Sequence, residues 1–323
     1  MNIPATPKIG VLINAHSGRN RTGTQALDAA LAARPEIPVQ RPAQAGETAS
    51  ALAALAAHGV DVLGICGGDG TVQQVLNALL SPQTPFAKMP VLAILPGGTT
   101  NMIAHDVNET SRPAKVLETV LRHIDGGTLA ARLTRRPVMR LTGGDAKAPA
   151  HGFFFGAAGI YEATLQNRDS VDKVGLRDGF GPGLRLLDVL FKIATGRDPF
   201  LPVPMAITLD GTAYGEKPVE ALLVSSLQKL SLGFVPFWGA GRGGLRLTMV
   251  FSHSKALLRA IWLALRSRAH PLLRPENGYD SGNFQRIELA FDGGCVLDGE
   301  IFHALRTQPI LLQNITELAF IRG

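Results

Sequence analysis

Residues 60–73 read VDVLGICGGDGTVQ, and this stretch decides the fold of the first part of the chain. Its mostly apolar beginning predicts a buried strand, and GGDG turns the chain into a predicted helix at 71–80. Glycines let a backbone adopt φ > 0 and approach a ligand closely, and a helix N-terminus attracts phosphate oxygens. Asp69 would repel phosphate unless a cation lay between them, so the stretch predicts a nucleotide site with Mg²⁺ at Asp69. A tight turn with Asp69 as the N-cap is the alternative.

The segments around this stretch alternate between patterns typical of strands and patterns typical of helices. Predicted strands lie at 8–14, 39–40, 60–66 and 91–95, and predicted helices lie at 25–33, 47–58, 71–80 and about 114–124. Such alternation with short loops is typical of a parallel sheet covered by helices, whose ligand lies beyond the carboxyl ends of the strands. The loops at Asn14, Gly67 and Pro96 should therefore meet at one edge.

The pattern changes after Ala130. Runs such as PVMRL, EALLVSSL, LRLTMVF and RIELAFDGG predict strands separated by turns. We therefore expect a Rossmann-like α/β nucleotide-binding domain at 1–130 and a mostly β domain at 131–323. Helical inserts are predicted in this second domain at about 183–195 and 254–268.

Two further motifs carry groups suited to chemistry. Residues 96–101 read PGGTTN, a glycine-rich loop with hydroxyl and amide groups, and Asp298-Gly299-Glu300 lies near the C-terminus. A carboxylate can take the proton of an attacking hydroxyl during phosphoryl transfer. On a strand Asp298 and Glu300 would share a face, but Asp-Gly is also a common turn dipeptide.

In this order, the motifs resemble those of the diacylglycerol kinase catalytic domain family, whose relatives include sphingosine and ceramide kinases. The resemblance implies catalytic roles for Asp69, Asp298 and Glu300, with Mg²⁺ near Asp69, and it leaves open which carboxylate is the base. It implies that the second domain, at 131–323, is of β-sandwich type, carries the Asp298 motif to the domain cleft and shapes a lipid pocket. The residues implied to bind ATP are Asn14, Ser17, Gly18, Gly67, Gly68, Asp69, Gly70, Thr71, Val72, Gln73, Gly98, Thr99 and Asn101.

The chain departs from the family pattern at three places. Arg41-Pro42 stands where threonines are common, which puts one adenosine-side contact in doubt. Met102 replaces an aspartate after Asn101, and the stretch GAGRGGLRL at 239–247 lacks the carboxylate of a structural magnesium site. We therefore expect only the magnesium ion that accompanies ATP.

The function that follows is an ATP-dependent lipid kinase that phosphorylates a hydroxyl of a membrane lipid. Diacylglycerol, giving phosphatidic acid, is the first choice of acceptor, and ceramide or a sphingoid base is the alternative. NAD kinases also use a GGDG-type loop, so an NAD kinase-like enzyme is a second alternative. A non-catalytic nucleotide- or lipid-binding regulator is a third.

Composition limits the partners and the compartment. The 323 residues are 46% hydrophobic and carry a net charge of +6, which favours anionic partners. Aromatic residues make up only 6%, and no recognition motif favours nucleic acid. Cys66 and Cys295 form no CxxC pair, which argues against a disulfide scaffold or a zinc site. No stretch is long and apolar enough for a membrane span. The chain is expected in the cytoplasm, and a homodimer is left open.

A basic segment predicts how such an enzyme would reach a membrane. Residues 252–274 contain five lysines and arginines and no acidic residue. As a helix, the segment would place Lys255, Arg259 and Arg266 on one edge with Trp262 beside them. The pattern predicts peripheral docking on the anionic inner face of the membrane. A helix that merely covers the β domain is the alternative.

Overall fold

A computed structural model describes residues 4, 6–18, 20, 23–108, 112–165, 201–230, 233–264 and 269–323. The chain divides into a first unit, residues 1–136 with 317–323, and a second unit, residues 137–316. The division predicted at residue 130 did not anticipate that the C-terminal residues return to the first unit. The predicted helical insert at 183–195 lies outside the described residues.

The first unit is built on a parallel sheet. Its strands are β1 (Ile9–Ile13), β2 (Val39–Gln40), β3 (Val62–Gly67) and β4 (Val91–Pro96). They lie in the order β4-β3-β1-β2, and the end of β15 (Ile310–Ile321) pairs in parallel beside β4. All residues of β1, β3 and β4 are buried, as expected for strands covered on both faces.

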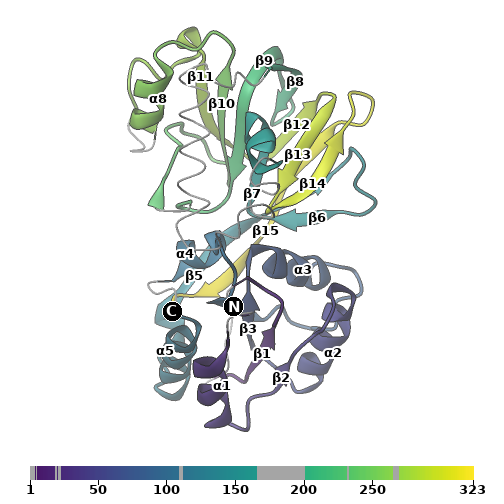
Figure 1. The fold of residues 1–323 in the computed structure, drawn as a ribbon, viewed down its shortest axis with the longest axis vertical. Helices are drawn as coiled ribbons and strands as arrows, with labels where there is room; N and C mark the ends of the chain where they lie inside the picture. Colours follow the sequence, from purple (N-terminus) through teal and green to yellow (C-terminus); the bar gives the residue numbers. More distant parts are fainter. Residues whose placement is uncertain are drawn as a thin grey trace. The chain divides into compact units, whose positions relative to one another are not determined.

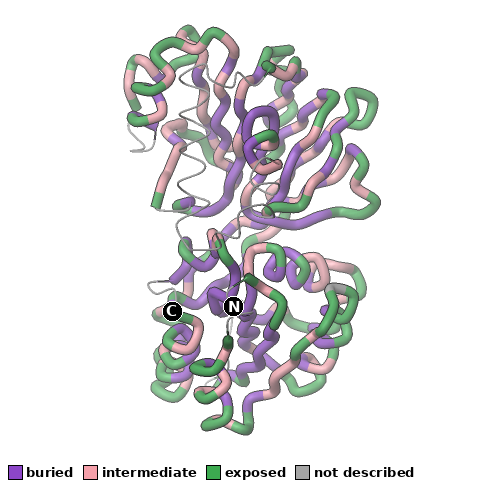
Figure 2. The backbone as a smooth tube through the Cα atoms, viewed as in Figure 1, coloured by how far each residue is buried: buried purple, intermediate pink, exposed green. Residues whose placement is uncertain are grey.

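Helices cover both faces of this sheet (Figure 1). On one side lie α1 (Gln25–Ala32) and α5 (Pro113–Asp125), whose leucines and valines share a core with alternate residues of the strands. On the other side lie α2 (Thr48–Ala57) and α3 (Asp69–Leu79). Figure 2 shows the strands buried and the outward faces of the helices exposed. The first unit also contains α4 (Met102–Val107), η2 (Ala45–Glu47) and η3 (Leu129–Arg132).

The register of the parallel strands places their carboxyl ends side by side. Ile13 pairs with Cys66, Gly67 pairs with Pro96, and Leu12 pairs with Gln40. The loops that begin at Asn14, Gly68 and Gly97 therefore leave the sheet at one edge, as the sequence predicts. Arg41, the first residue after β2, leaves the sheet at the same edge.

The second unit is mostly β. Its strands are β5 (Leu133–Thr142), β6 (Ala150–Gly152), β7 (Phe154–Ala158), β8 (Val203–Leu209), β9 (Thr212–Ser225), β10 (Leu245–Phe251), β11 (Tyr279–Phe284), β12 (Arg286–Ala290), β13 (Gly293–Leu297), β14 (Glu300–Ala304) and most of β15. The strand pairs described within this unit are antiparallel. Their buried residues, from Met139 to Leu312, share one core. The unit also carries α8 (Leu257–Ala264) and η5 (Pro275–Asn277). The predicted mostly β region is confirmed, and its β-sandwich type stays a prediction.

Candidate functional site

The centre of the candidate site is the N-terminus of α3. Gly68 is the N-cap, and its carbonyl oxygen accepts the N–H groups of Thr71 at 2.9 Å and Val72 at 3.1 Å. Gly70 is exposed, and a Cβ atom added there would meet nothing within 4 Å. The side chains of Thr71, Val72 and Gln73 are buried. This helix end is therefore open to an anion at Gly70, while Val72 and Gln73 offer a ligand only their backbone.

The loop after β1 packs directly on this helix end. Asn14 Nδ2 donates to Thr71 Oγ1 at 2.9 Å, and the Ser17 hydroxyl lies 3.1 Å from the same oxygen. Ser17 Oγ also accepts the N–H of Gly68 at 3.3 Å. The sequence predicts Asn14 and Ser17 as nucleotide contacts, and the structure shows that both also hold the Gly67–Thr71 loop in place.

Glycines let the three loops touch one another. A Cβ atom on Gly98 would lie 2.3 Å from the Cα of Gly68, and one on Gly18 would lie 2.3 Å from Thr99 Oγ1. The glycines of GGDG are not among the described residues with positive φ, so the loop does not use the left-handed conformation that glycine allows. Their small size is instead required because neighbouring loops occupy the space of a side chain.

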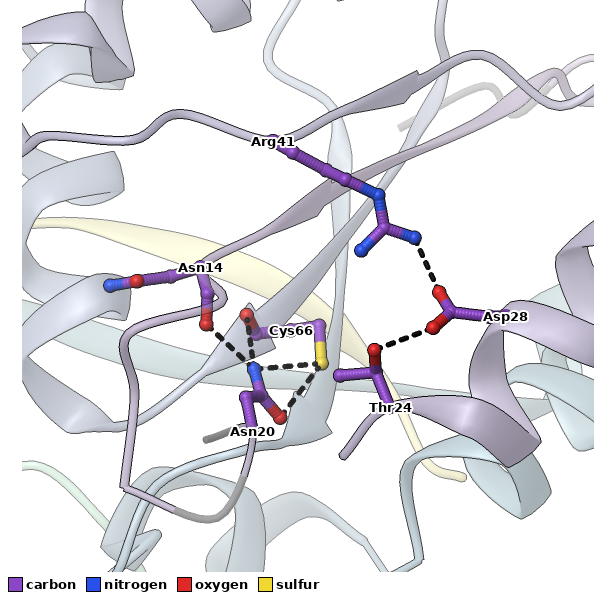
Figure 3. A network of polar contacts seen from close by, with 6 residues as sticks. All are labelled: Asn14, Asn20, Thr24, Asp28, Arg41 and Cys66. Carbon is purple, nitrogen blue, oxygen red and sulfur yellow. Dashed lines mark hydrogen bonds and ion pairs between the residues drawn. The ribbon is translucent and has the colours of Figure 1, made fainter. Parts of the chain in front are cut away.

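Asn20 joins all three loops, and sequence reasoning missed it. Its buried side chain donates to the carbonyl oxygen of Asn14 at 2.7 Å, and its backbone N–H donates to that of Gly97 at 3.2 Å. Figure 3 shows the same amide directed at Cys66, whose carbonyl oxygen lies 3.5 Å away. No spacing in the sequence distinguishes a buried asparagine from an ordinary loop residue.

Asp69 connects α3 with the third loop. Its two carboxylate oxygens accept the backbone N–H groups of Met102 and Ile103, each at 3.0 Å, which are the first N–H groups of α4. Burial raises the pKa of Asp69, and the hydrogen bonds from Ile103 and Met102 oppose that shift. Asp69 thus caps a helix other than its own.

Asn101 and Thr99 have different places in the third loop. The side chain of Asn101 is buried, accepts the N–H of Gly98 at 2.7 Å and donates to the Gly98 carbonyl oxygen at 2.6 Å. Its φ of 50° is left-handed, a conformation that asparagine tolerates better than most residues. Thr99 is exposed. Of the predicted contacts in this loop, Thr99 is exposed as a residue while its hydroxyl lies against Gly18, and Asn101 maintains the loop.

Arg41 adds a cation at the same edge of the sheet. Its guanidinium pairs with Asp28, which also accepts a hydrogen bond from Thr24 Oγ1 at 2.6 Å (Figure 3). Burial would raise the pKa of Asp28, but the bonds from Thr24 and Arg41 outweigh it and lower that pKa. Both partners of the ion pair remain almost half exposed. Arg41 is therefore accessible where the resemblance left a contact in doubt.

The donor set fits the magnesium ion that accompanies a nucleotide. In the part of the chain that the structure describes, no group of three or more His, Cys, Asp and Glu side chains could hold a metal by itself. Asp69 offers a single carboxylate whose oxygens already accept the N–H groups of Met102 and Ile103, so phosphates and water would have to supply most of the ligands of the ion. Mg²⁺ is commonly held by one or two carboxylates together with substrate phosphates and water.

The Asp298 motif forms a hairpin turn in the second unit. Asp298 and Gly299 have φ values of 46° and 92° and connect β13 with β14, and Leu297 pairs with Glu300. Two central residues with positive φ are typical of a type I′ turn, for which Asp-Gly is a favoured pair. The turn interpretation of this dipeptide is therefore correct, and the shared strand face is not formed.

The two carboxylates of this turn have different environments. Asp298 accepts the N–H groups of Phe153 and Phe154, each at 2.9 Å, and so ties the turn to the start of β7. Glu300 is exposed, and no hydrogen bond or ion pair joins its carboxylate to another described residue. Of the two, Glu300 is the carboxylate that faces solvent.

Comparison with known proteins finds the model of the same family in the first part of the chain. Residues 8–130 match the diacylglycerol kinase catalytic domain. No curated protein matches the chain. The match confirms the resemblance for the part of the chain that contains the three loops, and it identifies the protein as a kinase.

Solved structures of similar fold include two proteins from Bacillus anthracis str. Sterne. One, provisionally named a diacylglycerol kinase, is 19% identical, with 99% of each chain covered and a TM-score of 0.67. Another, described as a diacylglycerol kinase, is 19% identical, covering 98% of this chain and 97% of its own, with a TM-score of 0.61. Yeast NADH kinase in complex with NADH is 11% identical over 98% of this chain and 84% of its own, with a TM-score of 0.52. At these identities the likeness extends to the fold alone.

Proposed function

We propose that this kinase transfers the γ-phosphate of ATP to a hydroxyl group of a membrane lipid, with diacylglycerol as the acceptor and phosphatidic acid as the product. The observation that carries the proposal is the convergence of three loops on the N-terminus of α3, within the residues that match the diacylglycerol kinase catalytic domain. Ceramide and sphingoid bases offer the same chemistry, a hydroxyl group on a lipid, and remain the alternative acceptors.

The nucleotide phosphates would bind at the open end of α3. The exposed Gly70 leaves room for phosphate oxygens, and the helix N-terminus favours their negative charge. Asp69 would be the protein's ligand to Mg²⁺, which, when bound, neutralises phosphate charge that the carboxylate alone would repel. The exposed residue Thr99 and the Arg41 guanidinium at the same sheet edge would contact the rest of the nucleotide.

The transfer step needs one proton acceptor. The lipid hydroxyl oxygen bonds to the γ-phosphorus, the bond from that phosphorus to the β,γ-bridging oxygen breaks, and ADP departs with the electron pair. The hydroxyl proton must leave as the new bond forms, and we assign it to the Glu300 carboxylate. Asp298, with both oxygens bonded to backbone N–H groups, would position the turn that carries Glu300.

A nicotinamide nucleotide is a competing acceptor, because yeast NADH kinase has a similar fold. Incubation with ATP labelled at the γ-phosphate and a panel of diacylglycerol, ceramide, sphingoid base and NAD separates the possibilities. Label in a phosphorylated lipid, identified by mass spectrometry, supports the proposal. Label in NADP with none in lipid would refute it.

A further inference from the structure

The loops at the carboxyl edge of the parallel sheet are rich in glycine, the residue with the greatest conformational freedom. They begin at Asn14, Gly68 and Gly97, directly after β1, β3 and β4. A site that orients a ligand has to hold its groups within about 0.5 Å of their productive positions. Glycines have no side chains with which to lock such loops together, so another residue has to fix them.

Asn20 donates N–H groups to the backbone at the ends of all three strands. Its side-chain Nδ2 donates to the carbonyl oxygen of Asn14 at 2.7 Å and lies 3.5 Å from that of Cys66 (Figure 3). Its backbone N–H donates to the carbonyl oxygen of Gly97 at 3.2 Å, and its own carbonyl oxygen accepts the N–H of Gly23 at 3.1 Å. One residue is therefore bonded to the first, second and third loops.

The carbonyl oxygens around Asn20 depend on this amide. Asn20 is only 7% exposed, and a backbone oxygen in a buried place needs a hydrogen-bond donor. Without the amide, the carbonyl oxygen of Asn14 would keep the longer bond from the N–H of Ser17, at 3.3 Å. The N–H groups of Asn20 also offset the partial negative charge of these oxygens, at the edge where the phosphates are proposed to bind.

The amide of Asn20 also lies flat against Gly97. A Cβ atom added to Gly97 would be 2.6 Å from both Nδ2 and Oδ1 of Asn20 and 2.8 Å from its Cγ. A side chain at this position would therefore push the amide away from its bonding partners. Asn20 fixes the third loop in two ways, by a hydrogen bond and by direct contact.

The two loops held by Asn20 are in turn bonded to the N-terminal end of α3. Asn14 Nδ2 donates to Thr71 Oγ1 at 2.9 Å, and the N–H of Gly97 donates to the carbonyl oxygen of Gly67, also at 2.9 Å. A shift of either loop would move the backbone that surrounds the open helix end at Gly70. Asn20 can therefore influence a ligand at this end through Asn14 and Gly97.

We propose that Asn20 is a positioning residue of the nucleotide site, whose N–H groups set the spacing of the three loops and with it the affinity for ATP and its Mg²⁺. This role rests on the proposed function, because it assumes that the nucleotide phosphates bind at the end of α3. Its consequence is selective: loss of the amide weakens ATP binding beyond any loss of stability.

Isothermal titration of the full chain with ATP and Mg²⁺ tests this role. Asn20→Ala should raise the dissociation constant of ATP roughly tenfold, the effect of about one lost hydrogen bond. The KM for ATP should rise in parallel, while the KM for a detergent-dispersed lipid acceptor stays unchanged. Asn20→Leu has a similar volume but no N–H group, and it should behave like Asn20→Ala. Normal ATP affinity in Asn20→Leu would show that the donor is not needed.

A matched control is available at Asn108, at the far end of α4 from Asp69. Asn108 is also 7% exposed, its amide donates to the Ile94 carbonyl oxygen at 2.6 Å, and it accepts the N–H of Gly323 at 3.2 Å. Asn20→Ala and Asn108→Ala should both lower the urea denaturation midpoint, but only Asn20→Ala should weaken ATP binding. An equal rise of the dissociation constant in both would overturn the positioning role in favour of general stability.

A double-mutant cycle tests whether Asn20 acts through Gly97. Gly97→Ala should raise the dissociation constant of ATP roughly tenfold, because its methyl group displaces the amide. In the Asn20→Ala background the same methyl group has room, so the second substitution should add little. Fully additive effects would contradict the coupling. Gly97→Ala alone gives the reading if Asn20→Ala does not fold, and unchanged ATP affinity in that variant would overturn the role.

The unaltered protein separates failure of this inference from failure of the function. Absence of ATP binding by the unaltered protein would contradict the proposed function, and the role of Asn20 with it. Tight ATP binding by the unaltered protein, matched by folded Asn20→Ala, would overturn the role of Asn20 alone and leave the function standing.

Discussion

Two aspartates in different parts of the chain each accept a pair of backbone hydrogen bonds. Asp69 accepts the N–H groups of Met102 and Ile103, and Asp298 accepts those of Phe153 and Phe154. A carboxylate that binds two consecutive backbone N–H groups fixes a loop strongly, because these hydrogen bonds are charge-assisted. The sequence identifies both residues as important. It cannot show that both carry structural contacts, since their partners lie far away in the chain.

Asp69 should contribute to both catalysis and stability. We expect Asp69→Ala to lower kcat by roughly 100-fold or more, a typical effect of losing a preorganised electrostatic group. The loss leaves two N–H groups without their acceptor, so the free energy of unfolding should also fall by about 1–3 kcal/mol. Steady-state kinetics and urea denaturation measure the two effects. Near-normal turnover by the folded variant would remove Asp69 from the catalytic machinery.

Substitutions of Glu300 and Asp298 should differ in their effects on turnover and stability. Glu300→Gln should lower kcat by roughly 100-fold or more, with little change in the KM for ATP or in stability, because its carboxylate is exposed and makes no bond to a described residue. Asp298→Asn should lower the denaturation midpoint as well as kcat, because it weakens a bond to Phe153 or Phe154. The assignment of the base is wrong if Glu300→Gln turns over at the normal rate.

Substitution of Arg41 tests whether the nucleotide binds at the carboxyl edge of the parallel sheet. We expect Arg41→Ala to raise the dissociation constant of ATP by about tenfold, the loss of one charge-assisted hydrogen bond of about 1.5 kcal/mol. Arg34→Ala is the matched control, because Arg34 also pairs with carboxylates, Glu36 and Asp125, but follows the C-terminal end of α1. Isothermal titration with ATP needs no lipid acceptor. Equal affinities for the two variants would exclude Arg41 from the site.

Element by element, the periodic segments were predictable and the short ones were not. The helix predicted at 25–33 is α1, Gln25–Ala32, and the strand predicted at 91–95 is β4, Val91–Pro96. Helix α4 was missed because six residues show no period, and its N-terminus is capped by Asp69 from another loop. Strand β11 was missed because YDSGNF is rich in residues that disfavour strands, and pairing with β10 holds it in place.

A buried ion pair should stabilise the packing of α4 against β5. Arg136 pairs with Asp106, and their side chains are 3% and 0% exposed. We expect Asp106→Ala to cost about 3–5 kcal/mol, because it leaves the guanidinium buried without its partner. Replacement of both residues, Asp106→Leu with Arg136→Met, should recover most of that loss. Urea denaturation would contradict this account if the double variant were less stable than the single one.

At the scale of the whole molecule, the sequence predicts the order of the motifs but not the path of the chain. Parallel strands ending in glycine-rich loops predict that these loops meet at one edge of the sheet, and the register of β1, β3 and β4 confirms that they do. The C-terminal residues form the end of β15, where Phe320 pairs with Leu92 of β4. A local pattern gives no sign that the last strand completes the first sheet, because the pairing joins residues more than two hundred positions apart.

No helix in the described part of the chain is long and apolar enough to cross a membrane. The sequence places the apolar residues Leu258 and Trp262 on the predicted helix at 254–268, and both are exposed on α8. Which of them point outward could not be predicted, because the inward face is defined by packing against Leu273 and Tyr279.

The central claim is that the γ-phosphate of ATP goes to a lipid hydroxyl. The most direct measurement is transfer of label from γ-labelled ATP to diacylglycerol dispersed in detergent, with the Glu300→Gln variant as the control and NAD as the competing acceptor. The account predicts labelled phosphatidic acid that requires Mg²⁺, falls by roughly 100-fold in the variant and is unaffected by NAD. Labelled NADP with no labelled lipid, or no transfer to any lipid hydroxyl, would contradict it.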